Sequence, residues 1–162
     1  SADIYLTVRS PKEVYKSKLK KLKVRAKRNG AHNIDLRLIN STKPIKKLKE
    51  KADRLLIDAP CSGLGVLRRN PDTKWKLKPE FLDKIKKTQQ HILQDYSKIL
   101  KPGGKMVYAT CSMLPSENQE QIAKFIASEK GRKFKLIKEK KIFAHKSGYD
   151  SFYIALLEKP IQ

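Results

Sequence analysis

The sequence predicts an α/β fold built on a mostly parallel sheet with helices on both faces. Strand-like and helix-like segments alternate along the chain, and one strand segment, residues 55–57, is apolar throughout. Such runs are typical of parallel strands that are covered on both faces. No internal repeat or Gly/Ser linker divides the 162 residues. These three observations indicate a single domain over residues 1–162, with strand–helix units in one sheet.

The first third of the chain predicts a strand, a helix and a second strand. Residues 4–8 form a short strand candidate. Residues 13–28 place apolar side chains at helical spacing, and Asn29-Gly30 ends that run. Residues 34–39 alternate apolar and polar side chains, as a strand does. The lysine-rich residues 43–51 are expected to form a connector or a short helix.

The middle of the chain predicts a long loop followed by a long helix. After the strand at residues 55–57, residues 58–78 are rich in Gly, Pro and Arg, and loops of this length are usually functional. Residues 79–100 have helical periodicity. The apolar side chains expected to face the core are Phe81, Ile85, Ile92, Leu93, Tyr96 and Leu100.

The last third predicts a strand, a helix and two closing strands. Residues 105–110 form a strand that ends directly on Cys111. Residues 116–128 form a helix that Ser116 and Gln119 would begin as a capping box. Residues 134–137 and 152–157 are expected to pair antiparallel at the C-terminal edge of the sheet.

The charge of the chain favours a polyanionic partner. The sequence has 38 Lys and Arg against 16 Asp and Glu, a net charge of +22. A field of this size attracts nucleic acid through phosphate neutralisation, although a lysine-rich proteome would give the same count without specific binding. No apolar run approaches the roughly 20 residues that span a bilayer. With no secretory signal, the chain is expected to be cytoplasmic and its two cysteines to be free thiols.

The two cysteines each follow a predicted strand. Cys61 lies in Asp58-Ala59-Pro60-Cys61-Ser62-Gly63, and Cys111 lies in Tyr108-Ala109-Thr110-Cys111-Ser112. In open α/β sheets, chemistry takes place beyond the carboxyl ends of the strands. The alternative interpretation is that both cysteines are small buried core residues, which is the commonest environment of a free cysteine.

The paired motifs resemble the Sun/Nop2 family of S-adenosylmethionine-dependent RNA 5-methylcytosine methyltransferases. The resemblance extends over roughly residues 53–159, in the family's order and spacing. It is carried by Leu67-Arg68-Arg69-Asn70-Pro71-Asp72-Thr73-Lys74-Trp75, Lys101-Pro102-Gly103-Gly104, Pro115-Ser116-Glu117-Asn118 and Asp150-Ser151-Phe152-Tyr153. It implies a Rossmann-like methyltransferase fold, the cofactor S-adenosylmethionine and an RNA partner, either rRNA or tRNA.

The resemblance also implies roles for three side chains. Cys111 would be the nucleophile that adds to C6 of cytosine, and Cys61 would assist release of the enzyme after methylation. Cytosine C5 is too weak a nucleophile to take a methyl group unaided, so a covalent thiol adduct splits one hard step into easier ones. Asp58 would contact the flipped cytosine or, with Pro60, the cofactor. Asp58 could instead be an ordinary turn residue.

The long loop offers candidate RNA contacts. Arg68, Arg69 and Lys74 could bind phosphate, and Trp75 could stack on a base or pack in the core. The arginines could equally lock the loop through ion pairs. The three histidines occur in unrelated contexts, so neither a metal site nor a His-based triad is predicted.

The sequence departs from the family at the cofactor half. No glycine-rich loop precedes residue 4, Val8 stands where the family has an acid that binds ribose, and Asn40-Ser41-Thr42 replaces a second acidic position. We therefore expect the C-terminal portion of a methyltransferase catalytic domain, incomplete at its N-terminus, that uses upstream recognition and cofactor-loop segments. The alternative function is a degenerate or truncated member that binds RNA without catalysis. A dithiol redox protein is disfavoured because no Cys-x-x-Cys pair is present.

Overall fold

The computed structural model describes residues 4–8, 12–38 and 43–161, which fall into two compact units. The first unit, Ser1–Leu48, contains β1 (Ile4–Val8), α1 (Lys12–Arg28), β2 (Ile34–Leu38) and α2 (Lys43–Lys47). β1 and β2 pair in parallel, with Ile4 opposite Ile34 and Val8 opposite Leu38. The strand–helix–strand order predicted for this segment is confirmed. Asn40, Ser41 and Thr42 lie outside the described residues.

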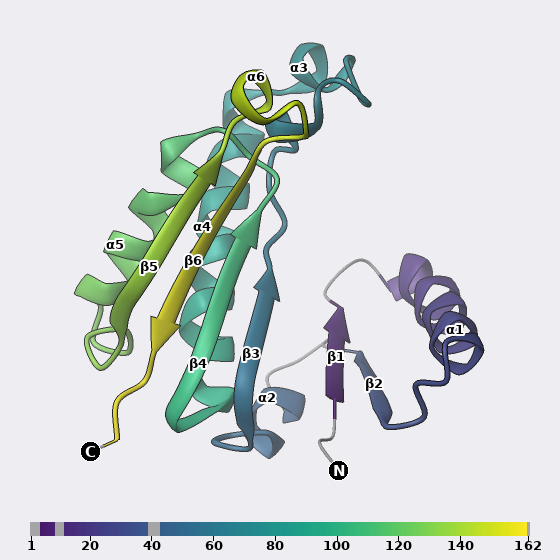
Figure 1. Ribbon diagram of the computed structural model, residues 1–162, viewed down its shortest axis with the longest axis vertical. Coiled ribbons are helices and arrows are strands. Elements are labelled where there is room, and N and C mark those ends of the chain that lie inside the picture. Colours follow the sequence, from purple (N-terminus) through teal and green to yellow (C-terminus); the bar gives the residue numbers. More distant parts are fainter. Residues whose placement is uncertain (1–3, 9–11, 39–42, 162) are drawn as a thin grey trace. The chain divides into compact units, whose positions relative to one another are not determined.

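The second unit, Lys49–Gln162, is built on a sheet whose described strands have the order β3-β4-β6-β5 (Figure 1). β3 (Ala52–Asp58) pairs in parallel with β4 (Leu100–Thr110). β6 (Phe152–Glu158) runs antiparallel to β4 and to β5 (Lys135–Ile142). The predicted antiparallel C-terminal edge is therefore confirmed.

Two helices of this unit, α4 (Pro79–Tyr96) and α5 (Gln119–Ala127), lie against the same face of the sheet (Figure 1). The burial of β4 alternates accordingly: Met106, Tyr108 and Thr110 have no exposed surface, whereas Val107 and Ala109 are partly exposed. Since successive side chains of a strand point to opposite faces, the core lies between the sheet and these helices.

The connections between these elements contain several single helical turns. 3₁₀ turns occupy Leu64–Val66, Ser97–Ile99 and Pro115–Glu117, and short helices α3 (Thr73–Lys76) and α6 (Ala144–Ser147) lie at the end of the sheet where β3 and β4 finish (Figure 1). The predicted loop at residues 58–78 thus has structure of its own. None of the helices in the described ranges is long and apolar enough to cross a membrane.

Three local predictions are wrong. α4 ends at Tyr96 and β4 begins at Leu100, before the expected residue 105, because Leu100 already pairs with Ala52 across a bulge. Phe81, expected in the core, is 45% exposed in the first turn of α4.

The predicted capping box is the third error, since α5 begins at Gln119 with Asn118 in the N-cap position. The Asn118 side chain makes no cap hydrogen bond, because its amide donates to the carbonyl of Ser112 and its oxygen accepts from the Thr110 hydroxyl. Tertiary contacts therefore determine how this helix starts.

Candidate active site

The two cysteines meet beyond the carboxyl ends of β3 and β4. The parallel pairing of these strands brings both ends to one edge of the sheet, and Ala59 continues the ladder by donating to the carbonyl of Ala109. The sulfur atoms of Cys61 and Cys111 lie 3.2 Å apart, within hydrogen-bonding distance, and both thiols are free. Two residues separated by fifty positions in the sequence thus form one partly buried thiol pair.

The thiols of this pair are not equivalent. A hydrogen bond from the Cys61 thiol lowers the pKa of Cys111 from its ordinary value of 9.0 to about 7, although burial and the carboxylates of Asp58 and Glu117 oppose this. The same hydrogen bond, together with burial, raises the pKa of Cys61. Cys111 therefore ionises first, with Cys61 as the protonated donor. A thiolate near neutral pH is the form that attacks electrophilic carbon.

This asymmetry predicts a pH profile. In the wild-type chain, alkylation of Cys111 should be half-maximal near pH 7. Cys61→Ala removes the donor, so the midpoint should rise by about 1 to 2 pH units, and the thiolate share at pH 7 should fall from about half to roughly a tenth or less. Cys61→Ser keeps an O–H donor and should shift the midpoint less. The midpoints are measured by alkylating each protein over a range of pH and quantifying the label on each cysteine by mass spectrometry. An unchanged midpoint in Cys61→Ala would contradict the assignment of the donor.

A buried polar cluster lies directly behind the thiols. It contains the two serines that follow the cysteines and a carboxylate: Ser62, Ser112 and Glu117 are 6%, 2% and 0% exposed. Gln89 of α4, also 0% exposed, donates to the carbonyl of Pro60 (2.9 Å) and to Glu117 (3.1 Å). Nothing in the sequence analysis gave Gln89 or Glu117 a role. Gln89 could have been found, because it lies four residues from both Ile85 and Leu93 and so occupies a core position of the helix.

Asp58 and Pro60 closely precede Cys61 at the end of β3. Asp58 is the last residue of β3, opposite Ala109, and its side chain is exposed. Pro60 is also exposed, although its carbonyl is bound by Gln89. An exposed carboxylate at a strand end can accept hydrogen bonds from a ligand there. Their contacts to a base or a cofactor stay predictions.

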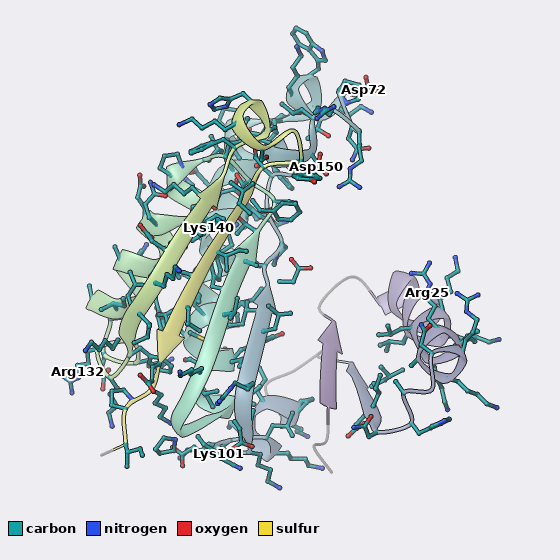
Figure 2. The ribbon with its side chains drawn as sticks, viewed as in Figure 1. Arg25, Asp72, Lys101, Arg132, Lys140 and Asp150 are labelled. Carbon is teal, nitrogen blue, oxygen red and sulfur yellow. The ribbon has the colours of Figure 1, made fainter. Side chains whose placement is uncertain are left out.

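The predicted RNA-contact residues divide into two groups. Arg68 donates to the carbonyl of Gly148 at 2.5 Å, and Arg69 forms an ion pair with Asp150, so both arginines connect the loop to the segment before β6. Figure 2 shows Asp150 at the end of the sheet from which the loop that carries Asp72 extends. The ammonium of Lys74 lies 4.6 Å from the ring centre of Trp75, and Trp75 is 80% exposed rather than packed in a core.

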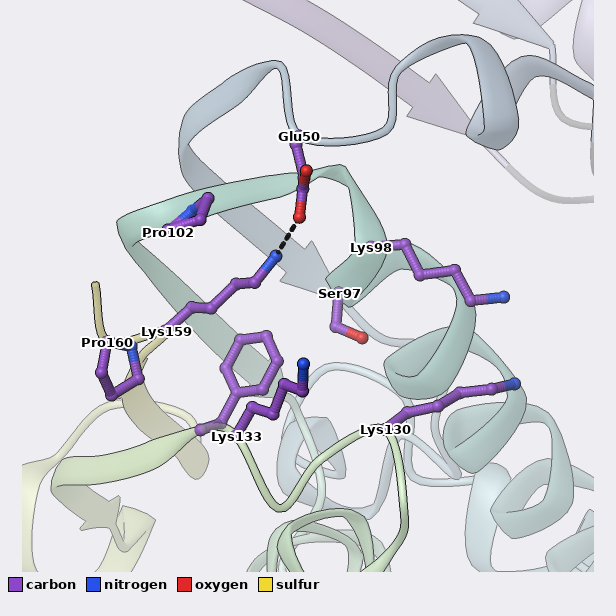
Figure 3. Close-up of a pocket in the computed structure, with 9 residues that line it drawn as sticks. Glu50, Ser97, Lys98, Pro102, Lys130, Lys133, Lys159 and Pro160 are labelled. Atoms are coloured by element: carbon purple, nitrogen blue, oxygen red, sulfur yellow. Dashed lines mark hydrogen bonds and ion pairs between the residues drawn. The ribbon is translucent and has the colours of Figure 1, made fainter. Parts of the chain in front are cut away.

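A hollow of about 330 Å³ lies at the opposite end of the sheet. Lysines are prominent in its lining, and Lys159 forms an ion pair with Glu50 (2.9 Å) that lowers the pKa of that carboxyl (Figure 3). No cysteine lines it, so it is distinct from the thiol site. Among the described residues, no group of three or more His, Cys, Asp or Glu side chains could hold a metal ion.

Comparison with known proteins identifies the family. The family model described as 16S rRNA methyltransferase RsmB/F matches residues 9–158. The chain belongs to this RsmB/F family. The match confirms the predicted resemblance to Sun/Nop2 RNA methyltransferases and includes both cysteine motifs, the loop between them and the polar cluster.

Individual relatives agree with the family match. A Bacillus subtilis protein named probable ribosomal RNA small subunit methyltransferase B is 34% identical over 91% of this chain, which spans 36% of that protein. The Shewanella oneidensis ribosomal RNA small subunit methyltransferase B is 51% identical over 48% of this chain and 18% of its own length. The chain therefore spans about a fifth to a third of these relatives over the matched segments.

Two crystal structures have the same fold. PH0851 superposes with a TM-score of 0.86 at 28% identity, covering 98% of this chain and 37% of that one. NSun6 from Pyrococcus horikoshii with SFG superposes with a TM-score of 0.81 at 25% identity, covering 100% and 42%. The predicted Rossmann-like methyltransferase fold is thereby confirmed.

Proposed function

We propose that this chain carries the active site of an S-adenosylmethionine-dependent methyltransferase that modifies C5 of cytosine in ribosomal RNA. The observation that carries the proposal is the thiol pair: Cys111 has its pKa lowered to about 7 by a thiol 3.2 Å away. Membership of an rRNA methyltransferase family supplies the substrate class and the cofactor, and one structural neighbour was crystallised with SFG, an analogue of that cofactor. Because the relatives named rRNA methyltransferases are bacterial proteins, we also propose a cytoplasmic location.

The first chemical step is addition of the Cys111 thiolate to C6 of cytosine. A bond forms between sulfur and C6, and the electron pair of the C5=C6 double bond moves toward C5, which becomes nucleophilic. We propose that the exposed carboxylate of Asp58, the last residue of β3, hydrogen-bonds the edge of the flipped base and stabilises the charge that develops on addition. S-adenosylmethionine supplies the electrophilic methyl group that C5 takes up.

The last step releases the enzyme. A base removes the proton from C5, its electron pair restores the C5=C6 bond, and the Cys111 sulfur leaves as a thiolate. Cys61 assists because its thiol remains protonated and donates to that sulfur. A leaving thiolate with a lower pKa departs faster. The two cysteines thus act at opposite ends of the reaction, and binding of RNA without catalysis would require neither.

The direct test follows the methyl group. The gene product that contains this chain is incubated with rRNA and S-adenosylmethionine carrying an isotopic label in the methyl group, and the RNA is digested to nucleosides for mass spectrometry. The label should appear in 5-methylcytidine and disappear in Cys111→Ala. Label on another base or on ribose would contradict the proposed chemistry, and RNA binding without transfer would favour the non-catalytic alternative.

The loop residues predict how RNA is held. Trp75 is exposed and Lys74 covers one face of its ring, so we propose that a single-stranded base stacks there while Lys74 binds phosphate. Trp75→Ala should weaken binding of single-stranded RNA about tenfold. Ile161→Ala is a matched control, since Ile161 is equally exposed at the other end of the sheet. Fluorescence anisotropy with a labelled oligonucleotide measures both affinities, and equal affinities would contradict the stacking role.

A further inference from the structure

Something must hold the two thiols together, because they come from different loops. Cys61 and Cys111 each follow the last residues that pair in the β3–β4 ladder. A hydrogen bond between two thiols is weak, since sulfur is a poor donor and a poor acceptor. The 3.2 Å separation of the sulfur atoms therefore depends on contacts outside the pair.

One carboxylate contacts both loops. The Oε1 atom of Glu117 accepts from the backbone N–H of Ser62 at 2.8 Å and from Gln89 at 3.1 Å. Its Oε2 atom accepts from the hydroxyls of Ser62 at 2.6 Å and Ser112 at 2.5 Å. Ser62 follows Cys61 directly and Ser112 follows Cys111, so each thiol is one residue away from a side chain that Glu117 binds.

The hydrogens of the two hydroxyls are directed to this carboxylate by further hydrogen bonds. The Ser62 oxygen accepts from the N–H of Leu64 at 3.4 Å, and the Ser112 oxygen accepts from the N–H of Leu114 at 3.1 Å. Each hydroxyl therefore accepts from its own loop and donates to Glu117. A carboxylate accepts only, which matches a set of four donors.

Glu117 is itself fixed in place. It has no exposed surface, and its backbone carbonyl accepts from the buried Tyr108 hydroxyl at 2.8 Å. The next residue, Asn118, binds the carbonyl of Ser112 at 2.9 Å. Inside a protein such a network is stronger than in water, and losing one member leaves others unsatisfied.

We propose that Glu117 is a positioning residue that holds Cys61 and Cys111 in contact through the serine after each of them. It does not touch the substrate. It keeps the Cys61 thiol at the sulfur of Cys111, and its importance to methyl transfer rests on the proposed function of the two cysteines.

The test is the titration of Cys111 in Glu117→Gln. An amide cannot reproduce the four bonds, because whichever way it is turned its NH₂ group faces one pair of donors. The midpoint of Cys111 alkylation should rise from about pH 7 toward its ordinary value of 9.0. A rise of one pH unit lowers the alkylation rate at pH 7 about fivefold. Glu120→Gln removes an equal charge from an exposed position of α5 and should leave the midpoint unchanged.

The direction of the shift distinguishes positioning from charge alone. The negative charge of Glu117 raises the pKa of Cys111, so removing that charge without moving the thiols would lower the midpoint. A lowered or unchanged midpoint in Glu117→Gln would overturn the proposal. If circular dichroism shows that this variant does not fold, Ser112→Ala replaces it in the test. This substitution removes the hydrogen bond from the Ser112 hydroxyl to Glu117 and leaves the other three donors in place. Its midpoint should also rise, and a wild-type midpoint would overturn the proposal.

This experiment is independent of methyl transfer, since it needs neither RNA nor cofactor. A raised midpoint in a protein that transfers no methyl group would support the positioning role and contradict the proposed function. The converse result is a protein that transfers methyl groups but whose Glu117→Gln variant has an unchanged midpoint of Cys111 alkylation. That result would overturn only the positioning role.

Discussion

Cys61→Ala is expected to leave RNA covalently attached to Cys111, whereas Cys111→Ala is expected to form no adduct at all. In Cys61→Ala, no thiol donates a hydrogen bond to the Cys111 sulfur as it departs from the methylated base. Departure should therefore be slow, and the adduct should accumulate. Without Cys111, C6 has no nucleophile, and methyl transfer should fall by at least about a thousandfold. Denaturing gel electrophoresis of the gene product with labelled RNA and S-adenosylmethionine reports both results.

The double variant Cys61→Ala/Cys111→Ala is the control for this pair. It should behave like Cys111→Ala, because loss of the nucleophile precedes the step that Cys61 assists. An adduct in Cys111→Ala that disappears in the double variant would reverse the roles assigned to the two thiols.

The second large effect is expected at Gly65, which joins the loop after Cys61 to two other segments. Its N–H donates to the carbonyl of Cys111 at 2.8 Å, and its carbonyl accepts from the N–H of Ser151 at 2.9 Å. A Cβ atom at this position would overlap the backbone oxygens of Cys111 and Ser151. Backbone atoms cannot rotate away, so the strands or the loop must shift.

Gly65→Ala should therefore lower the free energy of unfolding by at least about 2 kcal/mol. The shift also moves the backbone of Cys111, so the midpoint of its alkylation should rise. Urea denaturation and thiol alkylation measure these two effects. Gly148→Ala is the comparison, because no atom lies within 4 Å of a Cβ there and only its φ of 75° opposes alanine. It should cost about 1 kcal/mol, the order expected for a residue with a Cβ in the left-handed region, and equal losses in the two variants would contradict a role for close packing at Gly65.

The order of strands and helices, and the proximity of the two cysteines, could be predicted from the sequence. Parallel strands end at the same edge of a sheet, so two motifs that each follow a strand could be expected to converge. Gly63 has a φ of 74°, in the left-handed region that favours glycine. Gly65 differs, because close contact with neighbouring backbone, rather than a left-handed φ, excludes a side chain there.

The sequence did not reveal the polar cluster. Glu117 binds Ser62 across 55 positions and Gln89 across 28, and no local pattern reports such contacts. The start of α5 was misjudged for the same reason, since Asn118 is engaged by Ser112 and Thr110 instead of capping its own helix. Exposure was also misjudged at Phe81, because helical periodicity alone does not show that the first turn of a helix is exposed to solvent.

The most direct test of the central claim is to identify the cysteine that bonds to cytosine. RNA whose target cytosine carries fluorine at C5 traps the adduct after methyl transfer, because no base can remove fluorine as it removes a proton. Digestion of the trapped wild-type protein and mass spectrometry then locate the modified peptide. We predict the methylated, fluorinated base on Cys111, with Cys61 free. The base on Cys61, or methylated RNA with no attached protein, would contradict the assignment of Cys111 as the nucleophile.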